Sequence, residues 1–105
     1  MIQSITVGEF SKILETNKNC QLVDVREIPE FESVHIRGSK LFPLSTFEKN
    51  INLIERDKPI YISCGVGKRA LKAAEYLESL GYKDLYVLEG GIKAWIEANH
   101  PVDWG

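Results

Sequence analysis

The chain has 105 residues, of which 44% are hydrophobic and 27% are charged, and its net charge is −2. This length and composition predict one compact domain over residues 1–105 with a single core. The slight acidity argues against a general nucleic-acid surface, which needs clustered basic residues. No apolar run approaches the roughly 18–20 residues that span a bilayer, and the first residues lack the pattern of a secretory signal. We therefore expect a cytoplasmic protein with no nucleic-acid or membrane partner.

The first quarter of the chain predicts a strand, a helix and a second strand. Ile5 could belong to a short strand, and Thr6 and Glu9 have the spacing of a capping box that begins a helix. Residues 21–25 form a near-continuous apolar run, which is typical of a strand buried on both faces of a parallel sheet.

The next segment predicts two short helices around a short strand. Pro29 can occupy the first turn of a helix that contains Glu30, Phe31 and Val34. A short strand is expected at residues 40–42, and Ser45 and Glu48 repeat the capping-box spacing.

The second half of the chain alternates strands and helices more clearly. Strands are predicted at residues 60–63 and 85–88, each followed by a helical pattern. The stronger helix covers residues 69–80 and ends at Gly81. Its apolar stripe consists of Leu71, Ala74, Leu77 and Leu80. A last helix should follow Gly90 and Gly91, bury Trp95 and end before Pro101.

This order of elements predicts an α/β protein with a three-layer α/β/α architecture. A central, mostly parallel sheet should carry helices on both faces. In such folds functional groups gather beyond the carboxyl ends of the strands. Cys64 lies at one of those ends.

The segment after Cys64 reads as a tight loop that enters a helix. Gly65 and Gly67 permit left-handed conformations and close approach of the backbone. Amides of such a loop can point inward, and the helix that follows adds its positive end. Lys68 and Arg69 add positive charge that could hold an anionic donor. This field favours the thiolate of Cys64, the reactive form of a cysteine.

A cysteine at a strand end can also be an inert core residue, because free cysteine is among the most buried residue types. The two glycines and the Lys68–Arg69 pair that follow, directly before a helix, favour the reactive interpretation. The only other cysteine, Cys20, precedes its strand, whereas Cys64 follows its own. In parallel strands of about five residues the two sulfurs should lie on the order of 15 Å apart, too far for a disulfide. The two cysteines also lack the spacing of a metal site, and no cofactor is indicated.

The loop Cys64-Gly-Val-Gly-Lys-Arg69 resembles the active-site loop of rhodanese domains, in which a cysteine opens a six-residue loop before a helix. Three further stretches resemble signatures of the same family. They are residues 22–31 (LVDVRE with EF), 35–44 (HIRGS with FPL) and 88–95 (LEGGIKAW). Together these matches cover nearly the whole chain.

The resemblance implies a sulfurtransferase with Cys64 as the catalytic residue and residues Gly65, Val66, Gly67, Lys68 and Arg69 as the substrate-binding loop. Cys64 would take a sulfane sulfur from thiosulfate or a persulfide, and would pass it to cyanide, a thiol or a protein acceptor. Many thiosulfate-using members carry a basic residue after the cysteine, where this chain has Gly65. That departure leaves a persulfide open as the donor.

Two other functions occur on the same fold. Rhodanese-like domains also serve as non-catalytic binding modules, although these commonly lose the cysteine that is present here as Cys64. Related phosphatases and arsenate reductases have five residues between cysteine and arginine, whereas four separate Cys64 from Arg69. The shorter loop favours a smaller sulfur-centred substrate over phosphate.

Three supporting residues are expected near the site. Asp24 and Arg26 should form part of an ion-paired scaffold at a strand end, with Arg26 bridging to Glu30. His35 should order a turn by hydrogen bonding rather than shuttle protons.

Overall fold

The computed structural model describes residues 1–17 and 19–105. A five-stranded sheet in the order β1-β6-β5-β2-β4 forms its centre, and every neighbouring pair of strands is parallel. The strands are β1 (Ile2–Ile5), β2 (Gln21–Asp24), β4 (Lys40–Leu41), β5 (Ile60–Ser63) and β6 (Leu85–Leu88). The predicted parallel sheet is therefore confirmed, including the short strands at Ile5 and at residues 40–41.

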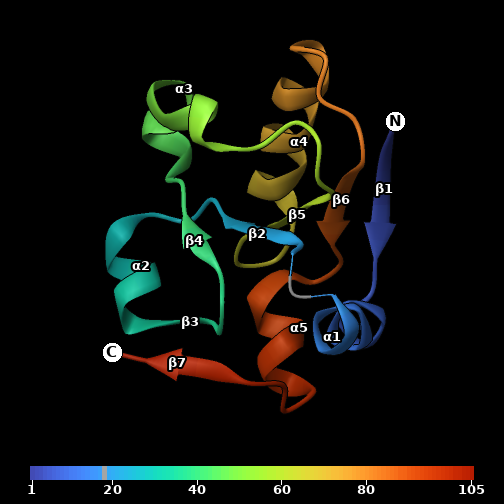
Figure 1. The fold of residues 1–105 in the computed structure, drawn as a ribbon. Coiled ribbons are helices and arrows are strands. Elements are labelled where there is room, and N and C mark those ends of the chain that lie inside the picture. Colours follow the sequence, from blue (N-terminus) through green and yellow to red (C-terminus); the bar gives the residue numbers. More distant parts are fainter. Residues whose placement is uncertain (18) are drawn as a thin grey trace.

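Helices cover both faces of the sheet (Figure 1). The helices α1 (Val7–Thr16) and α5 (Gly91–Glu97) pack together on one face, where Phe10 and Trp95 are buried. The helices α3 (Phe47–Asn50) and α4 (Lys68–Ser79) cover the other face. Because side chains alternate along a strand, Ile60 and Ile62 join the α3–α4 core and Tyr61 joins the α1–α5 core.

The remaining elements of the described residues are one helix, two 3₁₀ helices and two short strands. They are α2 (Ile28–Ser33), the 3₁₀ helices η1 (Leu44–Thr46) and η2 (Ile51–Leu53), and the strands β3 (Val34–Ile36) and β7 (Val102–Trp104). Strands β3 and β7 pair antiparallel in a small separate sheet (Figure 1). The sequence did not predict this second sheet, because three-residue strands carry almost no periodic signal. The expectation that Val34 belongs to the helix of Glu30 and Phe31 is wrong, since Val34 begins β3 and pairs with Trp104.

Of the two predicted capping boxes, one is present in the structure and one is not. The box of Thr6 and Glu9 is present at the start of α1. The second predicted box is wrong, since Ser45 lies within η1 and its hydroxyl donates to the Glu27 carboxylate. The carboxylate of Glu27 lies beside the start of α2 and draws Ser45 away from any capping role.

The predicted apolar stripe of α4 is half wrong. Leu77 and Ala74 are buried, but Leu71 and Leu80 are exposed. The buried face is made instead of Ala70, Ala73, Ala74 and Leu77. Small alanines let the helix lie close to the sheet, whereas a stripe defined by leucines selects a different face of the helix.

A buried ion pair closes the carboxyl end of β2. Asp24 and Arg26 are 1% and 4% exposed, and their Oδ2 and Nη2 atoms are 2.8 Å apart. The Arg26 backbone N–H also donates to Asp24 Oδ1, and its Nη2 donates to the carbonyl of Val34 at the start of β3. The predicted ion-paired scaffold is present, but the expected bridge from Arg26 to Glu30 is wrong. Glu30 binds Arg69 instead.

We predict that Asp24→Ala lowers the free energy of unfolding by about 3–5 kcal/mol, because it leaves the Arg26 guanidinium buried without its counter-charge. Urea denaturation at neutral pH measures this loss. Asp103→Ala is the matched control, because Asp103 pairs with Arg37 at the exposed surface, where removing an ion pair costs about 1 kcal/mol or less. Equal losses in the two variants would contradict the role given to Asp24.

Candidate active site

The sulfur of Cys64 lies at the amino end of α4. Cys64 follows β5, and its Sγ accepts hydrogen bonds from the backbone N–H of Gly67 at 3.0 Å and of Ala70 at 3.3 Å. Ala70 is in the first turn of the helix, where amides have no partner within the helix. The sulfur therefore occupies the place of a helix-capping oxygen. A negative charge on it would be stabilised by both amides and by the helix dipole.

The carbonyl groups of the same loop face a second helix. The N–H of Ile92 donates to the Cys64 carbonyl at 2.8 Å, and the N–H of Lys93 donates to the Gly65 carbonyl at 3.2 Å. Both donors belong to the first turn of α5, which also lacks partners of its own. The amino ends of α4 and α5 thus meet at the loop, with one supplying amides to the sulfur and the other binding the carbonyls.

Glycine is required at two positions for this arrangement. Gly67, which caps the amino end of α4, has a φ of +110°, in the left-handed region that favours glycine. Gly91 has a φ of +58°, and a Cβ atom there would overlap the Cys64 carbonyl oxygen and lie 2.6 Å from that of Gly65. A side chain at residue 91 would force α5 and the loop apart.

The guanidinium of Arg69 is held by a carboxylate on α2. Its Nη1 and Nη2 donate to the two carboxylate oxygens of Glu30 at 2.7 and 3.0 Å. Arg69 lowers the pKa of Glu30 to about 2. In turn, Glu30 raises the pKa of Arg69, and the charges of Cys64 and Asp24 act in the same direction. Arg69 is therefore within electrostatic reach of the sulfur, but its charge is neutralised by a neighbour.

The other loop residues differ in exposure. Val66 is 57% exposed at the tip of the loop. Lys68 is also exposed, and it has no ion pair among the residues that the structure describes. Gly65 supplies a backbone carbonyl to α5 and no side chain. The structure thus brings together all six residues of the predicted loop.

Cys64 itself is only 1% exposed. Exposure alone agrees with the inert-cysteine interpretation considered above. The hydrogen bonds point the other way, because an inert core cysteine needs no converging amides.

The supporting residues lie around the loop rather than in it. Asp24 pairs in register with Ser63, so its ion pair with Arg26 lies next to the strand end that carries Cys64. The ring of His35 stacks on Phe31, and its Nδ1 lies 3.0 Å from the Phe31 carbonyl. His35 therefore orders the junction between α2 and β3, which agrees with a structural role.

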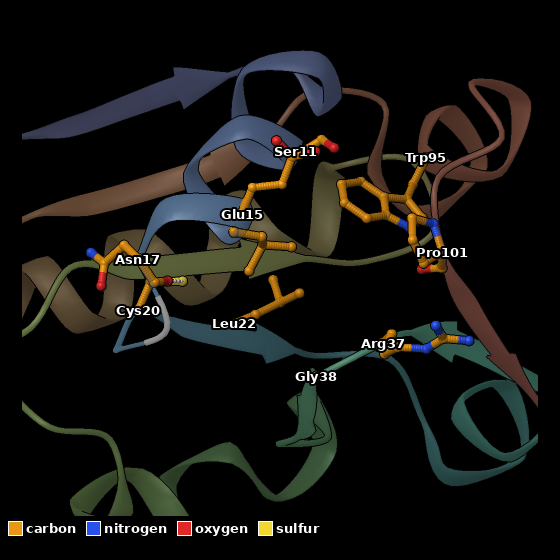
Figure 2. A pocket seen from close by; sticks show the side chains of 10 residues that line it. Ser11, Glu15, Asn17, Cys20, Leu22, Arg37, Gly38, Trp95 and Pro101 are labelled. Carbon is orange, nitrogen blue, oxygen red and sulfur yellow. Dashed lines mark hydrogen bonds between the residues drawn. The ribbon is translucent and has the colours of Figure 1, made fainter.

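A cavity of about 380 Å³ lies away from this loop, between α1, α5 and β2 (Figure 2). Leu22, Trp95 and Pro101 contribute to its walls, and Cys20 lies at one side. None of the residues 64–69 lines it. Because Gln21 is level with Ile60 and Asp24 with Ser63, Cys20 and Cys64 lie at opposite ends of the sheet, and neither forms a disulfide.

Two contributions to the site were missed by reasoning from the sequence. The pairing of Glu30 with Arg69 joins residues 39 positions apart, and no local pattern indicates it. The contact of α5 with the loop is indicated in the sequence only by the consecutive Gly90 and Gly91. A glycine pair predicts a close approach of the backbone, but it does not identify the segment that packs against it.

The parallel α/β sheet and the cysteine at its edge, whose sulfur accepts two backbone amides, indicate the class of protein. The chain belongs to the rhodanese-like domain family, whose model matches residues 6–98. It is 33% identical over 95 residues to the thiosulfate sulfurtransferase GlpE of Shewanella oneidensis, covering 90% of this chain and 93% of GlpE. It is 42% identical over 78 residues to YqhL of Bacillus subtilis, covering 74% of this chain but only 62% of YqhL.

The crystal structure of a rhodanese-like domain protein from Staphylococcus aureus has the same fold. It superimposes with a TM-score of 0.83 at 39% identity, covering 89% of this chain and 90% of that one. The predicted family and fold class are thereby confirmed, and the family includes sulfurtransferases. In addition, no helix among residues 1–17 and 19–105 is long and apolar enough to cross a membrane.

We predict that Gly91→Ala lowers the free energy of unfolding by about 2–4 kcal/mol, through left-handed strain and overlap with the loop. The amide resonances of Gly67 and Ala70 should shift in a ¹⁵N–¹H spectrum, because the loop moves. Gly8→Ala is the matched control, since a Cβ at Gly8 meets open space. It should change stability by about 1 kcal/mol or less and leave these two resonances in place. Unchanged resonances in Gly91→Ala would show that α5 does not position the loop.

We also predict that the pair of Glu30 and Arg69 loses its stabilising effect in acid. Since the folded pKa of Glu30, about 2, lies below the ordinary value of 4.5, its contribution is complete above about pH 4.5 and disappears as the pH falls towards 2. The contribution should be on the order of 1 kcal/mol, because the Glu30 side chain is 41% exposed. Urea denaturation of the wild type and Glu30→Gln between pH 7 and pH 2 measures it. A difference between the two proteins that stays constant with pH would contradict the assignment.

Proposed function

We propose that the chain is a sulfurtransferase in which Cys64 carries the transferred sulfur as a persulfide. The observation that supports this most directly is the pair of hydrogen bonds from Gly67 and Ala70 to Cys64 Sγ. The same two amides, aimed in advance, would stabilise the anion of the loaded cysteine. The similarity to GlpE, a thiosulfate sulfurtransferase, supports the same reaction class.

The reaction has two half-reactions. The Cys64 thiolate attacks the outer, sulfane sulfur of thiosulfate, the S–S bond of the donor breaks, and sulfite leaves with the electron pair. In the second step cyanide or an acceptor thiolate attacks the terminal sulfur of the persulfide and regenerates the Cys64 thiolate. Because the enzyme is covalently modified between the steps, double-displacement kinetics are expected.

The proposal assigns roles to the remaining residues. The loop residues 65–69 bind the donor, and Asp24, Arg26 and His35 support the loop from neighbouring elements. A small-molecule donor and a thiol acceptor are the expected partners, and a protein thiol could serve as acceptor. Residues 1–105 would act as one domain with no cofactor. The cytoplasmic location expected from the sequence stays a prediction.

A non-catalytic binding module is the second candidate, and the burial of Cys64 is the observation that favours it. Such a module would have the same fold but would not accept sulfur. A phosphatase or arsenate reductase is disfavoured by the four-residue spacing of Cys64 and Arg69.

We predict that thiosulfate or a persulfide adds one sulfur atom to the protein, detected by intact mass, and that added thiol removes it. Cys64→Ser should reduce this loading and thiocyanate formation from cyanide to background, because the hydroxyl cannot hold a sulfane sulfur. Cys20→Ser is the matched control and should load like the wild type. Hydrolysis of an aryl phosphate should stay at background in all three proteins.

If Cys64→Ser took up sulfur to the same extent as the wild type, Cys64 would have no part in the mechanism. Failure of the wild type to load from either donor would support the binding module.

A further inference from the structure

The net positive charge near the Cys64 sulfur is smaller than the sequence pair Lys68 and Arg69 suggests. Both terminal nitrogens of Arg69 are bound to the two carboxylate oxygens of Glu30. Asp24 and Arg26 form a second closed pair beside β5. Each pair has a net charge of zero.

Lys68 is left as the unpaired cation of the loop, among the residues that the structure describes. Gly65 brings no charge, and the exposed tip of the loop is the apolar side chain of Val66. The side chains of the loop therefore offer a net charge of about +1, and the exposed Lys93, whose N–H binds the Gly65 carbonyl, adds a second cation nearby. A thiolate at Cys64 balances one of these charges, so a dianion such as thiosulfate would meet less uncompensated positive charge than an unpaired Arg69 would provide.

A persulfide on an uncharged thiol carries at most one negative charge and meets less repulsion. We propose that Glu30 determines the donor, and that by neutralising Arg69 it makes the loop selective for thiol-bound persulfides over thiosulfate. This inference rests on the proposed sulfurtransferase function and specifies its substrate class. Glu30 acts here as a specificity-determining residue, since it contacts Arg69 rather than the reacting sulfur.

The step with such a donor is balanced. The Cys64 thiolate attacks the terminal sulfur of R–S–SH, a new S–S bond forms at Sγ, and the S–S bond of the donor breaks. The thiolate R–S⁻ leaves with the electron pair and takes a proton from water. The proton of the donor stays on, or is lost from, the new persulfide. No oxidant or reductant is consumed.

The test compares the rates at which Cys64 is loaded by thiosulfate and by the persulfide of 2-mercaptoethanol, followed by intact mass in single-turnover mixtures. In Glu30→Gln the carboxamide oxygen can still accept the Glu27 N–H that Glu30 accepts, but the charge of Arg69 is no longer balanced by a carboxylate. The ratio of the thiosulfate rate to the persulfide rate should rise about three- to tenfold at low salt, and less at high salt because exposed charges are screened.

Glu32→Gln is the matched control. It removes the same charge from the same helix, and Glu32 is exposed with no ion pair among the described residues. The ratio should stay within about twofold of the wild type, because the effect of an exposed charge is weakened by solvent and salt. Val66→Lys is a second variant that adds a cation at the exposed loop tip without touching Glu30, and it should raise the ratio as well.

The wild type should be loaded faster by the persulfide. A wild type that prefers thiosulfate, or an unchanged ratio in both Glu30→Gln and Val66→Lys, would overturn the inference while leaving sulfur transfer at Cys64 intact. An equal rise in Glu32→Gln would also overturn it, because net charge alone would then explain the effect. A wild type that neither donor loads would overturn the proposed function itself.

Discussion

The site depends on a loop that makes hydrogen bonds along both of its edges. On one edge, the amides of Gly67 and Ala70 point to the sulfur of Cys64. On the other, the carbonyls of Cys64 and Gly65 accept from the first turn of α5. A buried carbonyl without a partner is costly, and these two carbonyls lie in the loop segment directly before the Gly67 amide. Helix α5 therefore supplies the partners that let the loop face the sulfur with its amides.

This arrangement explains why two distant parts of the chain serve one cysteine. The parallel sheet places the ends of β5 and β6 side by side, so the helices that follow them, α4 and α5, begin at the same edge. The free amides at the start of each helix are used there. Gly91 allows α5 to approach the loop, because the carbonyls of Cys64 and Gly65 occupy the space that a side chain at residue 91 would need. The hydrogen bonds to the Cys64 sulfur thus come from backbone groups alone, and the role that we propose for the charged side chains is to select the donor.

The sequence predicted the parts of the fold that local patterns encode. Near-continuous apolar runs identified the three central strands, and the Thr6–Glu9 capping box identified the start of α1. The loop from Cys64 to Arg69 could be recognised because glycines, cations and a following helix are consecutive in the chain. Local patterns failed where the deciding contact is tertiary. Ser45 has the spacing of a capping residue, yet Glu27 offers its hydroxyl a charged acceptor.

The charge balance of the site shows the same limit. Arg26 and Glu30 are four residues apart, which is a favourable spacing for an ion pair within a helix. Arg26, however, precedes α2 and turns back to the buried Asp24, where loss of its partner would be expensive. Glu30 is then available to Arg69, 39 residues further along the chain. Which of two cations a carboxylate binds follows from burial and geometry, and neither can be read from spacing.

The central claim is that the amides of Gly67 and Ala70 hold the sulfur on which chemistry occurs. A ¹⁵N–¹H spectrum recorded before and after sulfur loading tests it most directly. The account predicts that the resonances of Gly67 and Ala70 shift more than those of the rest of the chain, return when thiol removes the sulfur, and do not respond to the donor in Cys64→Ser. Loading that leaves both resonances unmoved, or that shifts only those around Cys20, would contradict it.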